Sequence, residues 1–289
     1  MDILCFNKGS SMPNKTQVKQ AELFQEMHHK KKILVLPNVW DAGGAIIFEK
    51  QGFEAVGTTS AGISYSLGYP DGENITFDDI LDNTTKIAKR ASIALSVDVE
   101  RGYGTNTQEI ISNITRIIQA GAVGINIEDG ILSSKEISDM GEQAKLIKEI
   151  RKIKQNTGIN FVINARTDIF WLGVTGSKEE LLEKVISRAN VYLEAGADCI
   201  FVPGLFDRQD VQYLVKKING PLNLIATATS LSIEELEDLG VSRFSTGSGP
   251  VRASFALINS IASELKNEGT LNTVFQNSIS YDELNTIFE

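Results

Sequence analysis

Short runs of β-branched and other apolar residues alternate along the chain with longer segments in which apolar residues recur at helical spacing. The short runs predict eight strands, at residues 33–37, 55–59, 94–98, 123–127, 160–165, 199–202, 222–226 and 243–246. The segments that follow them predict eight helices, at residues 42–51, 77–90, 107–120, 142–155, 178–195, 208–218, 233–238 and 250–266.

Strands that alternate with helices pair in parallel, and eight such units fit a closed (β/α)₈ TIM barrel of the α/β class. An open doubly wound sheet is the alternative, but no Gly-x-Gly-x-x-Gly follows the first strand. We expect one barrel domain over residues 1–289, with a loose leader at 1–15, an amphipathic helix at 16–31 and a C-terminal helical segment at 250–289. The scattered apolar residues of 270–289 are expected to pack on a neighbouring subunit.

The charge balance narrows the possible partners. The chain has 28 Lys and Arg against 37 Asp and Glu, a net charge of −9, which argues against nucleic acid as a partner. No apolar run approaches the length of a membrane span. Cys5 and Cys199 allow at most one disulfide, and the N-terminus lacks a signal-peptide core, so we expect a reducing, cytoplasmic location.

The two histidines limit the chemistry further. His28 and His29 are adjacent, precede three lysines and are expected on a solvated face. A zinc centre built from several histidines is therefore excluded, and a Ser-His-Asp triad would have to recruit one of this pair. A catalytic metal would be held by oxygen, which favours Mg²⁺ or Mn²⁺.

Acidic residues follow the predicted strands at the end where barrel enzymes carry their chemistry. The acids at these ends are Asp41, Asp98, Glu100, Glu128, Asp129 and Asp168, and Asp71 lies on a loop at the same rim. Crowded carboxylates repel one another, and a divalent cation together with Arg166 would neutralise them. Asp98 and Glu100 are two residues apart and are expected to point the same way, so that one binds the metal and the other orients a water. Helix capping or a structural salt bridge is the alternative for any one acid, above all for Asp129 and Asp168.

The polar motifs, taken in order, resemble the isocitrate lyase/phosphoenolpyruvate mutase superfamily over about residues 20–260. They are Asn38-Val39-Trp40-Asp41-Ala42, Thr59-Ser60-Ala61-Gly62, Leu67-Gly68-Tyr69-Pro70-Asp71-Gly72, Val97-Asp98-Val99-Glu100-Arg101-Gly102-Tyr103-Gly104, Ile127-Glu128-Asp129 and Asn164-Ala165-Arg166-Thr167-Asp168. The resemblance implies a barrel whose last helix is swapped between the subunits of a tetramer. It also implies Mg²⁺ or Mn²⁺ and small 2-oxo or 2-hydroxy carboxylic acids as substrates.

The same resemblance implies roles for individual residues. Asp98 would be the direct metal ligand, and Asp71, Glu100 and Glu128 would hold the waters around the metal. Arg166 would bind the substrate, Thr59, Ser60 and Ala61 would clamp its carboxylate, and Asn223 would add a further polar contact.

The chain also departs from the superfamily pattern. Residues 131–139 contain neither the cysteine nor the histidine that the lyases carry in this lid loop, and they lack the Asn or Thr of the mutases. Glu136 falls near the position of the cysteine, so Glu136 and Lys135 are candidate acid/base groups. Glu100 stands where many members have Asp, and Pro203 replaces a glutamate or histidine after the sixth strand.

These features predict a Mg²⁺-dependent lyase that cleaves a C–C bond of a small 2-oxo or 2-hydroxy acid through an enolate. A P–C bond mutase or hydrolase acting on a phosphonopyruvate-like substrate is the runner-up. A barrel that binds a metal and a dicarboxylate without catalysis is an alternative of another class.

Overall fold

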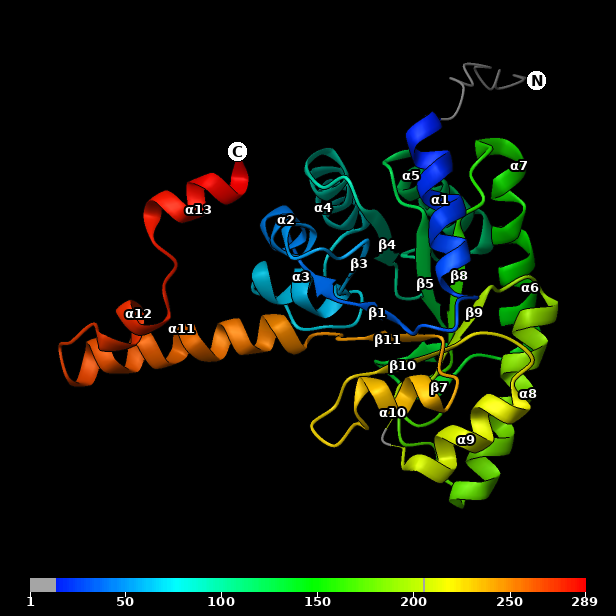
Figure 1. Cartoon of the computed structure of the whole chain (residues 1–289). Coiled ribbons are helices and arrows are strands. Elements are labelled where there is room, and N and C mark those ends of the chain that lie inside the picture. The colour runs from blue at the N-terminus through cyan, green and yellow to red at the C-terminus, as the bar shows by residue number, and fades with distance from the viewer. Residues whose placement is uncertain (1–13, 205) are drawn as a thin grey trace.

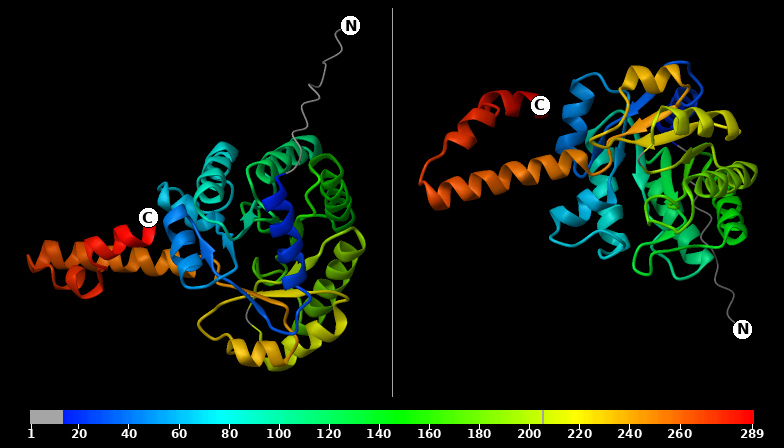
Figure 2. Two further views of the ribbon diagram at one scale, coloured as in Figure 1. Left: turned by 45° about the horizontal axis from the view of Figure 1, so that its top comes forward. Right: turned by 90° about the horizontal axis from the view of Figure 1, so that it is seen from below.

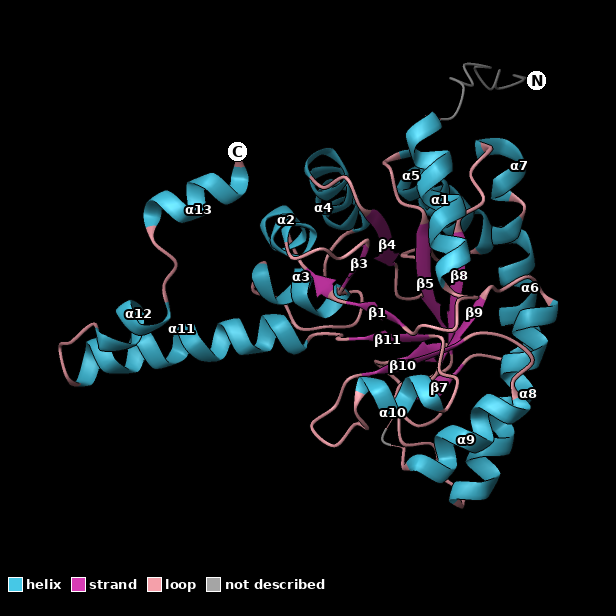
Figure 3. Ribbon diagram, in the orientation of Figure 1, coloured by secondary structure: helices cyan, strands magenta, loops and turns pink. Residues whose placement is uncertain are grey.

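A ring of parallel strands surrounded by helices forms the centre of the computed structural model, which describes residues 14–204 and 206–289 (Figures 1 and 3). The strands of this ring are β1 Leu34–Leu36, β2 Asn38–Val39, β3 Ala55–Thr58, β4 Ala94–Asp98, β5 Gly124–Glu128, β8 Val162–Arg166, β9 Cys199–Phe201, β10 Leu222–Ile225 and β11 Arg243–Ser245. All eight predicted strands are present. β1 lies within the first of them, at residues 33–37, and β2 continues this strand beyond the predicted end. The predicted (β/α)₈ barrel is thus confirmed.

Closure of the ring depends on a strand that Pro37 divides. β1 pairs with β11 on one side, and β2 pairs with β3 on the other. Proline has no N–H to donate to a ladder, so the strand is interrupted where it changes partner. The Asn38 side chain spans the gap, because its Nδ2 donates to the carbonyl of Thr58 at 2.8 Å and its Oδ1 accepts from the N–H of Gly247 at 2.8 Å.

Amphipathic helices cover the outside of the ring and follow the predicted order. They are α2 Ala42–Lys50, α4 Phe77–Arg90, α5 Thr107–Gln119, α6 Met140–Arg151, α7 Ile153–Thr157, α8 Lys178–Glu194, α9 Arg208–Lys217 and α10 Ile233–Asp238, followed by α11 Gly249–Asn267. Capping boxes begin several of them, for example Ser177 with Glu180 at the start of α8. The segment predicted as one helix at 142–155 is two helices separated at Lys152. A short helix that the sequence did not predict, α3 Ser60–Ser66, follows β3.

Helix α1, Lys15–Met27, closes the amino end of the barrel. Phe24 is fully buried and contacts the position of Gly124 at the start of β5. The Nε2 of Gln17 donates to the carbonyls of Ile118 and Ala122 at 2.7 and 3.0 Å. The leader predicted at 1–15 lies almost entirely outside the described residues, and so does Cys5.

The expectation that both histidines are solvated is wrong for His28. Its side chain is only 2% exposed because the chain turns into the barrel floor directly after α1, whereas His29 is exposed. The Nδ1 of His28 lies 2.7 Å from the carbonyl of Phe24, and its Nε2 lies 3.5 Å from Nη1 of Arg243. Burial, reinforced by the charge of Arg243 and of His29, lowers the pKa of His28 to about 3.

A pH-dependent loss of stability is expected from this histidine. The unfolded chain takes up a proton near pH 6.5 and the folded chain does not, so His28 lowers the free energy of unfolding as pH falls below 6.5. The expected contribution between pH 7 and pH 5 is about 2 kcal/mol. Urea unfolding of the wild type and of H28Q at several pH values measures it, and the variant should lose this part of the slope. If the free energy of unfolding of H28Q depends on pH as steeply as that of the wild type, His28 is not the source of this pH dependence.

The C-terminal segment leaves the barrel as a long arm (Figures 1 and 2). Helix α11 projects away from the ring, and α12 Asn272–Asn277 packs on it. The last helix, α13 Tyr281–Phe288, returns to α2, where the Phe288 ring lies against Gly43. Large apolar side chains of the arm remain exposed, namely Phe255, Ile258, Leu265, Leu271, Phe275, Ile279, Tyr281 and Leu284. Within the described part of the chain, no helix has both the length and the apolar character needed to span a membrane.

Candidate active site

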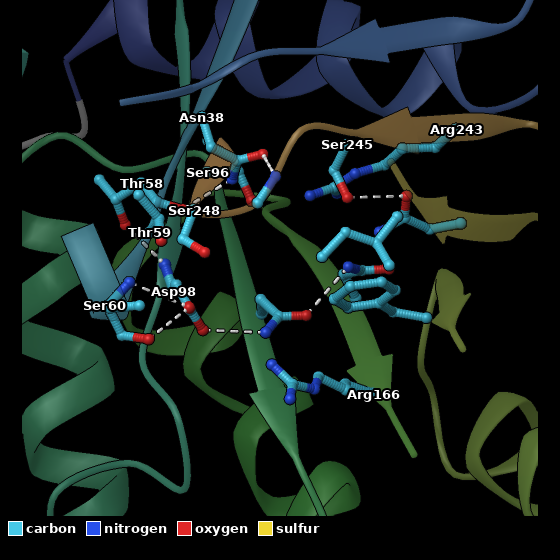
Figure 4. Close-up of a pocket in the computed structure, with 18 of the residues that line it drawn as sticks. Asn38, Thr58, Thr59, Ser60, Ser96, Asp98, Arg166, Arg243, Ser245 and Ser248 are labelled. Carbon is cyan, nitrogen blue, oxygen red and sulfur yellow. Dashed lines mark hydrogen bonds between the residues drawn. The ribbon is translucent and has the colours of Figure 1, made fainter. Parts of the chain in front are cut away.

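Two adjoining pockets open at the carboxyl ends of the barrel strands. Figure 4 shows the one that extends deeper into the barrel. The deeper pocket is lined by predicted site residues from four strands or their exits, namely Thr59, Ser60, Ala61, Asp71, Asp98, Arg166 and Asn223. The shallower one is lined by Glu100 and Glu128 and shares Ser60, Asp71 and Arg166 with the first. Asp41 lies elsewhere and caps α2 by accepting from the N–H of Gly44 at 2.7 Å.

Asp98 ends β4 and lies on the wall of the deeper pocket. Its Oδ2 accepts from the Oγ and the N–H of Ser60 at 2.8 and 3.1 Å, and its Oδ1 accepts from Nδ2 of Asn126 at 2.9 Å. These neutral donors fix the orientation of the carboxylate without neutralising its charge. Asp98 is therefore an oriented anion at the end of a strand.

Carboxyl groups outnumber cations around the two pockets. Five acids, Asp71, Asp98, Glu100, Glu128 and Asp168, face two guanidinium groups, Arg166 and Arg243, which leaves three negative charges in excess when all are ionised. Burial and the charge of Asp98 raise the pKa of Asp71. Burial also raises the pKa of Glu128, against the opposing charge of Arg166. The excess of acid is the electrostatic setting that a divalent cation would relieve.

Glu100 does not lie where strand alternation predicts. β4 ends at Asp98, and Glu100 has a φ of 46°, so the chain has turned before it. Its carboxylate accepts from the Tyr103 hydroxyl and from the N–H of Glu73 at 2.8 Å. Burial raises the pKa of Glu100 to about 8, although the Tyr103 bond opposes the shift. Glu100 reaches the rim of the shallower pocket through this turn rather than as a strand neighbour of Asp98.

The residues present fit an octahedral, water-rich cation rather than one enclosed by protein ligands. Among the described residues, no three His, Cys, Asp or Glu side chains converge closely enough to hold one ion. Mg²⁺ commonly keeps several waters and uses one or two carboxylates together with oxygen atoms of the substrate. A site in which Asp98 is the one direct protein ligand would match that pattern.

Arg166 ends β8 between two acids. Its Nη1 lies 3.0 Å from Oε2 of Glu128, and its Nε donates to Oδ1 of Asp168 at 2.6 Å. The ring of Trp171, 51% exposed, covers the guanidinium, with the Arg166 Cζ 5.7 Å from the ring centroid. Arg166 is therefore held rigidly at the mouth of the pocket, beneath an aromatic side chain.

Asp129 supports this arrangement from outside the pocket. It is fully buried and accepts from the N–H of Asp168 at 2.9 Å, from Nη1 of Arg188 at 3.0 Å and from the Tyr192 hydroxyl at 2.7 Å. The contacts of Asp129 are those of a buried structural salt bridge, the alternative to a role at the pocket. Asp168 forms a structural salt bridge with Arg166 and also lines the shallower pocket.

The predicted carboxylate clamp lies at the start of α3. Thr59 caps the helix by accepting from the N–H of Gly62 at 3.3 Å, and Ser60 and Ala61 form its first turn. All three residues are buried and line the deeper pocket. At this first turn the N–H and the hydroxyl of Ser60 both donate to Asp98.

Lys135 and Glu136 are not brought into either pocket. They lie on an exposed hairpin formed by β6 Gly130–Ile131 and β7 Glu136–Ile137. Glu136 accepts there from the Oγ of Ser134 at 2.9 Å. Leu132 of the same hairpin lines the shallower pocket and lies against Gly72, so the hairpin covers one side of the mouth.

Sequence reasoning missed the polar layer beneath the mouth. Ser96, Asn126, Asn164 and Arg243 line the deeper pocket, and Asn164 donates to Asn126 at 3.0 Å. Three of these residues precede a named site residue by two positions on a strand, namely Ser96 before Asp98, Asn126 before Glu128 and Asn164 before Arg166. A polar residue at every second position of an otherwise apolar strand is the signal that could have identified this layer.

Comparison with known proteins gives one matching family. The sequence model described as phosphoenolpyruvate phosphomutase matches residues 24–266. An uncharacterised protein of Mycobacterium tuberculosis is 37% identical over 235 residues, which cover 80% of this chain and 83% of that protein. The 2-methylisocitrate lyase of Escherichia coli is 28% identical over 275 residues, which cover 91% of this chain and 90% of the enzyme.

Solved structures share the architecture. A Burkholderia cenocepacia protein described as a lyase/mutase superposes with a TM-score of 0.87 at 29% identity, covering 95% of this chain and 97% of that one. A phosphonopyruvate hydrolase in complex with oxalate and Mg²⁺ gives a TM-score of 0.81 at 21% identity, covering 93% of this chain and 94% of that one. The second likeness concerns the fold alone.

Proposed function

Because the chain belongs to the phosphoenolpyruvate phosphomutase family, we propose that it is a Mg²⁺- or Mn²⁺-dependent lyase that cleaves a C–C bond of a small 2-oxo or 2-hydroxy carboxylic acid through an enolate. One observation carries the choice of chemistry: Asp98 and Arg166 lie in one acid-rich pocket next to the helix start at Ser60. The 2-methylisocitrate lyases among the relatives favour C–C cleavage.

The metal would be held by Asp98 directly, with Asp71, Glu100 and Glu128 around its waters. When bound, such a dication lowers the energy of negative charge that develops on a substrate oxygen. Arg166 binds the substrate and contributes a second positive charge at the mouth. Thr59, Ser60 and Ala61 clamp the substrate carboxylate, and Asn223 adds a polar contact from the opposite wall. Trp171 and Leu132 keep water from the mouth.

The proton donor is assigned to one of three groups. Glu128 already lies beside Arg166 at the mouth, with Nη1 of Arg166 3.0 Å from its Oε2. Lys135 and Glu136 would reach the pocket only after the hairpin that carries them closes, which is how lid loops complete many active sites.

A product screen tests the reaction class. Purified protein with Mg²⁺ is incubated with small 2-hydroxy and 2-oxo diacids, and released pyruvate or glyoxylate is measured with a coupled dehydrogenase. Release that stops when EDTA removes the metal supports the lyase. Absence of any keto acid release from the whole set would contradict it.

A P–C bond mutase or hydrolase is the second candidate. The description of the matched family, which names a phosphomutase, favours it. Phosphonopyruvate is therefore included in the screen, and release of inorganic phosphate or formation of phosphoenolpyruvate from it would select this reaction instead.

We further propose that the protein acts in the cytoplasm as a homotetramer in which the C-terminal arm is exchanged between subunits. Val251, Phe255, Ile258, Ala262 and Leu265 recur at helical spacing along one side of α11, and Phe255, Ile258 and Leu265 are exposed. An apolar stripe of this length on a projecting helix fits a second copy of the chain.

A charge on this stripe is expected to break the assembly. I258E places a carboxylate in the apolar contact and should shift the mass measured by light scattering from tetramer toward smaller species. S260E is the matched control, because Ser260 is exposed on the opposite side of α11. An unchanged mass for I258E would show that this side of α11 makes no subunit contact.

A further inference from the structure

Arg243 is a buried cation with no carboxylate partner among the described residues. It is 3% exposed, begins β11 and lines the deeper pocket from the wall opposite Thr58 and Ser60 (Figure 4). Within the part of the chain that the structure describes, its guanidinium has one hydrogen-bond contact, 3.5 Å between Nη1 and Nε2 of His28, and its Nε has no partner. The guanidinium carbon also lies 5.9 Å from the centroid of the Phe24 ring.

Other polar atoms at this inner end of the pocket are likewise unpaired. Asn223 is the strand neighbour of Arg243, and its Nδ2 has no partner among residues 14–204 and 206–289. Its Oδ1 accepts only a long bond, 3.4 Å, from the Oγ of Ser245. Arg243 and Asn223 therefore present unused donors to the same space.

An unpaired buried cation is costly, and native proteins seldom keep one without a partner. Burial lowers the pKa of Arg243 to about 10, so it stays charged at neutral pH. His28 lies on one side of it and is kept neutral by burial. Asp98, on the opposite wall, is the carboxylate whose charge acts on Arg243, and Asp98 is the residue assigned to the metal. Nothing else in the described lining is placed to neutralise the guanidinium.

We propose that Arg243 and Asn223 form an inner anion subsite that binds a second carboxylate, carried in the tail of the substrate. The subsite deepens the proposed function, on which it rests, because it selects a diacid over a monoacid with the same 2-hydroxy or 2-oxo head. A planar guanidinium beside one amide donor matches a planar carboxylate, whereas a phosphonate dianion has a third oxygen that would need further donors.

Paired acids that differ only in the tail charge test the subsite. Calorimetric titration of the Mg²⁺-loaded protein compares malate with 2-hydroxybutyrate, and 2-hydroxyglutarate with 2-hydroxyvalerate. The affinity for oxalate, which has no tail, measures binding at the mouth alone. The affinity for 3-phosphonolactate measures binding of a phosphonate in the tail. The wild type should bind at least one diacid about tenfold or more tightly than its uncharged partner.

Variants locate this preference in Arg243. R243M should abolish the preference for the diacid and leave oxalate affinity within about twofold, and R243K should retain part of it. H28Q is the matched control, since it removes the His28 imidazole that contacts Arg243 without changing the pocket lining, and it should keep the preference. Thermal unfolding confirms that R243M folds, and no loss of melting temperature is expected because an uncompensated charge is removed.

Several outcomes would overturn the subsite. If R243M still prefers the diacid, the second carboxylate binds elsewhere. If R243M loses affinity for oxalate and for the diacid equally, Arg243 has a structural role at the mouth. Tighter binding of 3-phosphonolactate than of either diacid assigns the subsite to phosphonates. Oxalate binding without any diacid preference in the wild type removes the subsite but leaves the proposed function standing, whereas failure to bind any acid, oxalate included, counts against both.

Discussion

Replacement of Asp98 by asparagine is expected to lower kcat/KM for the substrate found in the product screen by about a thousandfold or more, equivalent to about 4 kcal/mol of transition-state stabilisation. Asparagine keeps the size of the side chain and can still accept the bonds from Ser60. It removes the negative charge that would hold a dication at this strand end. The Mg²⁺-dependent binding of oxalate should disappear along with turnover, as calorimetry measures directly.

Stability separates this effect from misfolding. The charge of Asp98 raises the pKa of Asp71, so its removal relieves repulsion, and D98N should melt at the same temperature as the wild type or above it. D79N is a matched control, because Asp79 makes its bonds to Thr76 at the exposed start of α4, outside the pockets. Turnover by D98N within about tenfold of the wild type would rule out Asp98 as the metal ligand.

Substitution of Arg166 is expected to have the second largest effect. R166K keeps a positive charge but loses the planar fork, so kcat/KM should fall about a hundredfold or more. R166M also leaves Glu128 and Asp168 without their cation, and breaking such buried pairs costs about 3–5 kcal/mol of stability. Kinetics together with thermal unfolding of both variants measure the two effects.

The lysine variant keeps the test decisive if R166M does not fold. R116K is the matched control for it, because Arg116 pairs with Asp78 on the exposed surface and should tolerate the change without loss of turnover. A folded R166K enzyme with normal kcat/KM would show that no planar contact with the substrate is made at this position.

The alternation of apolar runs and helical segments was sufficient to predict the barrel, because each strand is short, buried and followed by a capped amphipathic helix. α3 was missed because residues 60–66 are rich in serine and glycine, which have low helix propensity. Its helical form depends on the Thr59 cap and on burial against the barrel, which are tertiary facts.

Strand ends likewise predicted which residues line the pockets, since the carboxyl ends of parallel strands converge. Backbone conformation after the strands was not predictable in the same way. Glu100 takes a left-handed conformation that alternation does not anticipate, and its carboxylate turns to Tyr103. His28 was misjudged because its neighbours in sequence are lysines, while its neighbours in space are Phe24 and Arg243.

The divided first strand links the architecture to the chemistry of this protein. Asn38 joins β3 to the segment after β11, and the same side chain is part of the pocket wall. Two requirements therefore limit natural variation at position 38: closure of the barrel and the shape of the pocket. A substitution that preserves barrel closure but alters the pocket would still be selected against, and so would the reverse.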